Sequence, residues 1–138
     1  IATSGSIAQM GYPTFEGIAV SSKFAQENPQ FLVAFAKALN RASAQVRDNL
    51  AKWTPDSPEA KAIAKWSKAD PKDVPAAMAL YRFPSAEEQL SAQWLEGGAA
   101  KAMTNTASFL KSQGRIQEIK PDYAAFVTNS YVQKALGR

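Results

Sequence analysis

A long amphipathic helix that begins at Pro29 is the strongest pattern in this sequence. Asn28 and Pro29 form a helix start signal, in which a capping side chain precedes a proline at the first helical position. Apolar residues then recur at three- and four-residue steps through about five turns. These residues are Leu32, Phe35, Leu39, Ala42, Val46 and Leu50. Because such a wide apolar face needs something to bury it, we expect this helix to pack against a sheet or several helices.

Shorter helices are predicted on both sides of the long one. Proline-containing start signals, apolar spacing and a capping box at Ser85 mark their beginnings, and Gly97 and Gly98 interrupt the chain between two of them. The predicted ranges are 4–10, 22–27, 58–66, 74–80, 85–95, 99–113 and 129–136. The chain is therefore predicted to be mostly helical.

One segment, residues 15–20, has the pattern of a short strand instead. Both faces of this strand are largely apolar, which is typical of the doubly covered sheets of α/β proteins. A second strand is expected at residues 1–3. Because a single strand cannot satisfy its own backbone groups, its partner must lie in another copy of the chain or in a missing N-terminal part. A dimer or strand swap through this edge is accordingly predicted.

Composition limits the chemistry that this chain can perform. It has 138 residues, of which 46% are hydrophobic and 20% charged, as expected for one globular domain. Histidine and cysteine are absent, which excludes the usual nucleophilic triads and metal sites built on imidazole or thiolate. No nucleotide motif surrounds the glycine pair, so we predict no catalytic residue, metal or cofactor. The net charge of +4 is spread among acids, which argues against nucleic acids and anionic membranes as partners.

Acid pairs such as Glu87-Glu88 and Asp70/Asp73 lie at predicted helix starts, where capping explains them, and Glu16 is an exception to this. In the predicted strand it shares a face with Thr14, near the rim of a sheet, where α/β proteins bind ligands. It could be a solvated side chain at an exposed strand end. The pattern alone favours this interpretation, and the alternative is that Glu16 accepts hydrogen bonds from a cationic group of a ligand. The pattern does not exclude either interpretation.

Three blocks of the sequence resemble one family of transport proteins. The run GYPTFEGIAVSSKFAQENPQFLVAFAKALNRA resembles a segment of taurine-binding periplasmic proteins, in which a G-x-P-T-F-E-x-x-V-V strand precedes an F-A-x-x-(H/N)-P helix. Residues 104–116 are similar to the D-T-A-x-F-L-K-x-Q-G-K-(V/I) segment of that family, and residues 121–132 are similar to its C-terminal end. The order and spacing of the blocks match across most of the chain.

The resemblance implies a particular fold for the chain. It matches the C-terminal portion of the taurine and alkanesulfonate branch, whose type II periplasmic-binding-protein fold has two α/β lobes. Residues 1–138 would form that portion, with 1–21 in the hinge or crossover-strand region and 22–138 in the helical part of the lobes. The expected class is thus α/β, with the chain itself mostly α-helical and containing one or two short strands.

The resemblance also implies a function. The protein would be the periplasmic substrate-binding component of an ABC importer for sulfur uptake, exported by a leader that this chain lacks. It would deliver taurine or a related aminosulfonate or alkanesulfonate to the membrane permease without chemistry. Glu16 would accept the ligand ammonium, with Thr14 and Tyr12 beside it. Tyr12 itself, Gly17 and the Arg82-Phe83 pair depart from the family pattern and leave the exact ligand open.

Two other classes are weighed against this one. A self-contained helical interaction domain would pair the 15–20 strand within the chain or across a dimer, with Glu16 facing solvent. A thiamine-pyrimidine-synthase-like enzyme has the same general fold, but the resemblance implies that its reaction needs His and Cys. This chain contains neither.

Overall fold

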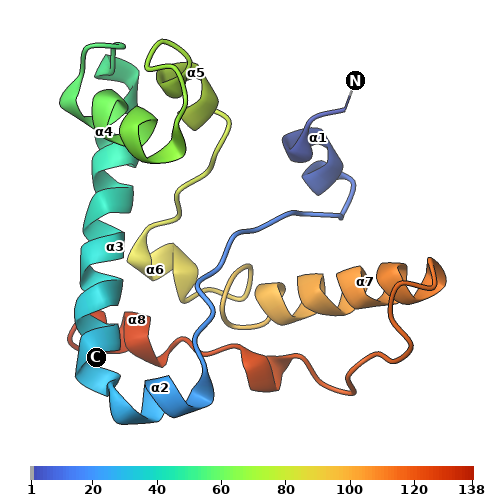
Figure 1. The fold of residues 1–138 in the computed structure, drawn as a ribbon. Helices are drawn as coiled ribbons and strands as arrows, with labels where there is room; N and C mark the ends of the chain where they lie inside the picture. Colours follow the sequence, from blue (N-terminus) through green and yellow to red (C-terminus); the bar gives the residue numbers. More distant parts are fainter. Residues whose placement is uncertain (1) are drawn as a thin grey trace. The chain divides into compact units, whose positions relative to one another are not determined.

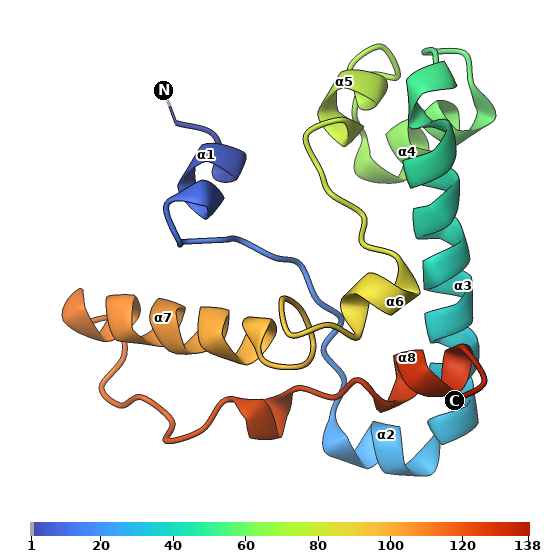
Figure 2. The same cartoon turned by 180° about the vertical axis from the view of Figure 1, so that it is seen from behind.

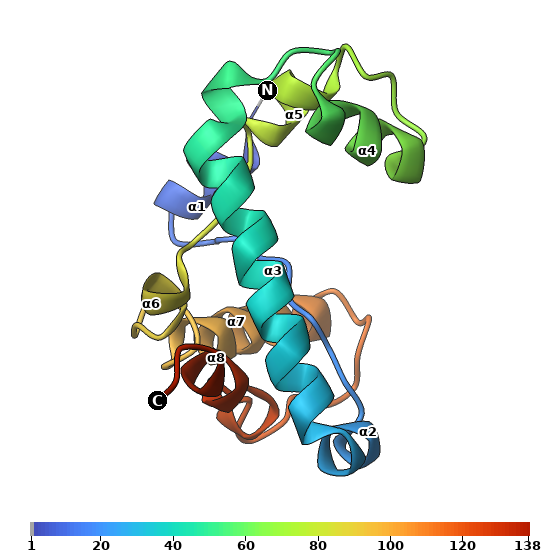
Figure 3. The same ribbon diagram turned by 90° about the vertical axis from the view of Figure 1, so that its left-hand side faces the viewer.

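The chain forms two compact units in the computed structural model, which describes residues 2–138. The terminal unit contains the residues up to Lys37 together with Ala86–Arg138, and the central unit contains Ala38–Ser85. The long helix α3 contributes its first turns to the terminal unit and the rest to the central unit, and Figure 3 shows it as one continuous helix.

All regular secondary structure in the described residues is helical (Figure 1). The α-helices are α1 (Ser4–Gln9), α2 (Ser22–Glu27), α3 (Pro29–Asn49), α4 (Pro58–Ser67), α5 (Val74–Met78), α6 (Ala86–Gln89), α7 (Gly98–Ser112) and α8 (Ser130–Ala135). The 3-10 helices are η1 (Leu50–Lys52) and η2 (Ala124–Phe126). The predicted helices are therefore present, although α6 ends well before residue 95.

The predicted α/β fold with one or two short strands is wrong for the described residues. Residues 15–20 form no strand, and no backbone hydrogen bond within residues 2–138 involves residues 13–20. At the other predicted strand, Ile1 lies outside the described residues, and Thr3 caps α1 by accepting a hydrogen bond from the Ser6 N–H at 3.1 Å. A strand needs a neighbour for its N–H and C=O groups, and the described chain supplies none. The predicted dimer or strand swap therefore gains no support.

The long helix forms as predicted, but most of its apolar face is not buried. Leu32 is buried, whereas Phe35 and Leu39 are exposed and Val46 and Leu50 are only partly covered. The start signal also works differently from the prediction, because the Asn28 side chain donates to the Phe24 carbonyl oxygen at 3.1 Å and so closes α2. The periodicity correctly predicts the helix, and it overestimates the burial.

The central unit has a small closed core between α4 and α5. Ala60, Ala64 and Val74 are buried there, and Ile63 and Met78 pack against them. Small side chains let the two helices approach closely, and α5 also contacts η1. Two start signals in the sequence, each with a proline, thus lead to helices that bury their apolar residues against each other.

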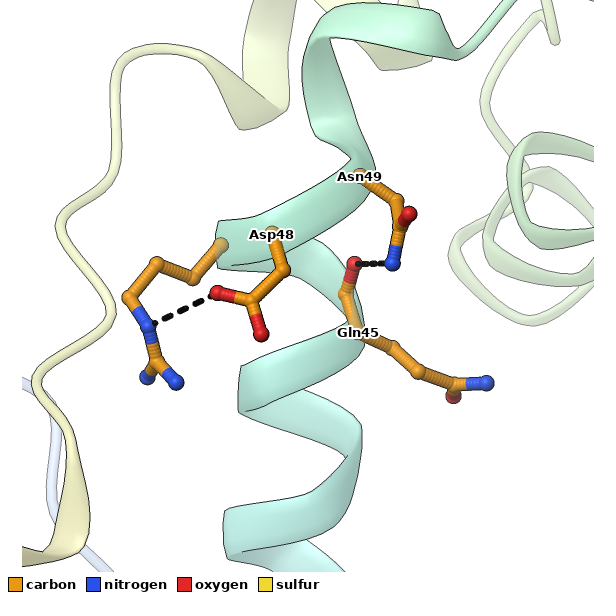
Figure 4. Close-up of polar contacts among 4 residues, drawn as sticks. Gln45, Asp48 and Asn49 are labelled. Carbon is orange, nitrogen blue, oxygen red and sulfur yellow. Dashed lines mark hydrogen bonds and ion pairs between the residues drawn. The ribbon is translucent and has the colours of Figure 1, made fainter.

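Polar contacts at the end of α3 are local and exposed (Figure 4). The Asn49 side-chain amide donates to the Gln45 carbonyl oxygen at 3.2 Å, and the Arg47 guanidinium pairs with the Asp48 carboxylate at 3.2 Å. The first contact adds a side-chain donor to a carbonyl in the last turns of the helix. The ion pair joins neighbouring residues on the surface and contributes little to stability.

The terminal unit is organised around α7. After this helix the chain turns back and runs beside it through η2, as Figure 2 shows from behind. Ala102 and Ala107 are buried on α7. Gly98 permits the approach to α7, because a Cβ atom there would collide with the Gln93 carbonyl oxygen. The glycine pair therefore allows the close backbone contact at the start of α7.

Candidate functional site

The predicted ligand-binding residues lie on the extended segment that follows α1. Gly11 ends this helix with a φ of 94°, a conformation that glycine adopts readily. The Tyr12 N–H then donates to the Ile7 carbonyl oxygen at 3.2 Å, which ties the start of the segment to α1. Beyond Pro13 the backbone has no hydrogen-bonded partner among the described residues until α2 begins. The segment is thus anchored at both ends and unpaired between them.

An open groove of about 460 Å³ separates this segment from α7. It is lined by Pro13, Thr14, Phe15, Met103, Thr106, Ala107, Leu110, Ile116 and Tyr123. Most of the lining is apolar, and the side-chain polar groups are the hydroxyls of Thr14, Thr106 and Tyr123. The Tyr123 hydroxyl already accepts a hydrogen bond from the Lys120 N–H at 3.4 Å. The groove is open to solvent and offers few hydrogen-bonding side chains.

The three predicted site residues do not converge on the groove. Thr14 lines it, whereas Glu16 and Tyr12 do not. Tyr12 is 66% exposed and Glu16 is also exposed. The Glu16 carboxylate makes no ion pair or hydrogen bond to a described residue, and therefore stands free to accept one. Its environment fits both interpretations left open by the sequence, a solvated side chain and a ligand acceptor.

Sequence reasoning missed the residues that α7 and the following loop bring to the groove. The sequence predicts Met103 and Thr106 only within the helix at residues 99–113, and it does not single out Tyr123. The available signal was Asp122, whose carboxylate accepts a hydrogen bond from the Ala124 N–H at 2.7 Å. An aspartate of this kind starts a turn that holds the neighbouring tyrosine in place. No sequence pattern, however, indicated that this turn would face residues 13–15.

A second hollow, of about 340 Å³, lies at the start of α7. Its lining includes Glu96, Gly97, Thr128 and Asn129. A helix start with glycines can bind anions, but here the first N–H groups are already used. The Gly98 N–H donates to the Ala92 carbonyl oxygen at 2.9 Å, and the Ala99 N–H donates to the Trp94 carbonyl oxygen at 2.8 Å. Two of the backbone donors at the start of α7 are therefore already occupied.

No group of three or more His, Cys, Asp or Glu residues that could hold a metal ion occurs within residues 2–138. Among the helices described, none combines the length and the apolar character needed to cross a membrane.

One curated protein is similar to nearly the whole chain. The taurine-binding periplasmic protein of Escherichia coli (strain K12) is 30% identical to it over 130 residues, which is 94% of this chain. The chain spans 40% of the length of that relative. No protein-family model matches the chain. The chain is thus similar to a protein whose name describes it as taurine-binding and periplasmic.

Proposed function

We propose that this chain is the C-terminal portion of the periplasmic substrate-binding protein of an ABC importer. It would bind taurine or a related aminosulfonate or alkanesulfonate and deliver it to the membrane permease for sulfur uptake. The observation that carries this proposal is the similarity to the taurine-binding periplasmic protein over 130 residues. The proposal includes export to the periplasm and no catalytic step.

Glu16 is the ammonium acceptor in this proposal. A zwitterionic ligand such as taurine requires an acceptor for its ammonium and donors for its sulfonate, and a carboxylate is the strongest acceptor that a protein can offer. The free carboxylate of Glu16 supports this role, as does the position of Thr14 on the groove. The sulfonate donors would come from residues outside this chain.

The exposed apolar surface of the terminal unit supports the idea that more protein packs against it. Large exposed apolar side chains in this unit are Met10, Tyr12, Phe15, Ile18, Val20, Phe24, Phe31, Phe35, Phe109 and Phe126. A complete soluble domain rarely leaves so many uncovered. In the proposed protein, residues 1–21 would lie in the hinge region and residues 22–138 in the helical part of the lobes.

Titration calorimetry on the longer protein that we propose contains this chain tests the function. We expect heat of binding with taurine, weaker binding with an unsubstituted alkanesulfonate, and none with nitrate. If none of the three binds, the proposed function is wrong.

The same titration with Glu16→Gln tests the site separately. Removing the negative charge from a charge-assisted hydrogen bond should weaken taurine binding by about 10- to 100-fold. The affinity for an alkanesulfonate, which has no ammonium, should stay the same. If the variant binds taurine as tightly as the original protein, Glu16 is not the acceptor even though the transport function stands.

A self-contained helical interaction domain is the second candidate. The purely helical structure of the described residues and the exposed Glu16 favour it. The uncovered apolar surface of the terminal unit argues against it. An enzyme related to thiamine-pyrimidine synthases is not favoured by any feature of the structure.

A further inference from the structure

We draw no further inference here: the strongest candidate, the exposed aromatic cluster that Phe24 of α2 forms with Phe31 and Phe35 of α3, is an unpartnered apolar face, and nothing in the structure shows what covers it.

Discussion

The central unit closes a small core between two of its helices, although Leu39, Trp66, Leu80 and Tyr81 remain exposed there, whereas ten large apolar side chains among the described residues of the terminal unit are exposed. In the central unit, α4 and α5 are separated by a short loop and close a core around Ala60, Ala64 and Val74. In the terminal unit, Phe31 and Phe35 stack at 6.2 Å between ring centroids, yet both remain exposed. Both units contain well-formed helices. The comparison shows that helix formation and burial are separate outcomes, because burial needs a partner surface that a periodic pattern does not supply.

The largest effect should follow from a charge placed in the core of the central unit. Val74→Asp would bury an unpaired carboxylate at a position that is 3% exposed, at a cost of about 3–5 kcal/mol. We expect amides of α4 and α5 to lose protection in hydrogen exchange. Ala76→Asp, at an exposed position of α5, is the control and should leave exchange nearly unchanged. Retained protection in Val74→Asp would mean that this core is not what holds the unit together.

In the terminal unit, the largest loss of stability is expected at a close backbone approach and not at a buried core residue. Gly98→Ala would force the new methyl group against the Gln93 carbonyl oxygen, and we expect a loss of about 1–3 kcal/mol in thermal unfolding followed by circular dichroism. Gly17→Ala is the matched control, since its Cβ would meet only the Phe15 ring at 3.7 Å. Equal melting curves for the two variants would show that the backbone at the start of α7 can shift to accommodate the new methyl group.

Exposed aromatic residues of the terminal unit should contribute little to stability in this chain. Phe35→Ala removes the stacking with Phe31 and should cost about 1 kcal/mol, against about 3–5 kcal/mol for a phenylalanine in a closed core. Denaturant-induced unfolding measures the difference. A loss of the larger size would show that Phe35 is buried in solution, and the contrast between the units would fail.

The smallest effect on stability should come from a surface charge in the central unit. Hydrogen bonds from the Lys72 backbone N–H and side chain lower the pKa of Asp70. Because the folded pKa lies below the ordinary value of about 3.9, the contribution is present above that pH and is lost as the pH falls through the lowered pKa. We expect an NMR titration of Asp70 to show this pKa while α4 and α5 stay folded. An unshifted pKa would contradict the hydrogen bonds from Lys72 to Asp70. Unfolding of α4 and α5 as the pH falls through the lowered pKa would show that this surface charge contributes as much to stability as the buried core does.

Prediction from sequence succeeded where the deciding contacts are close in the chain. The helices α3, α4 and α7 begin and end near the predicted residues, because capping, proline and periodicity act within a few residues. It failed for residues 15–20, whose short, largely apolar run fits a strand that the described structure does not form. It also placed Thr14 near a candidate site without indicating that Thr106 and Tyr123 would face it.

The sequence by itself determined the helices, their order, and the absence of histidine and cysteine chemistry, since each depends on residue identity and near neighbours. The tertiary structure decided which apolar faces are covered, that Glu16 stands free beside rather than within the groove, and that Trp66 is exposed while Ala60 and Ala64 of the same helix are buried. These outcomes depend on surfaces distant in the chain, and a local pattern carries no information about which surface will meet it.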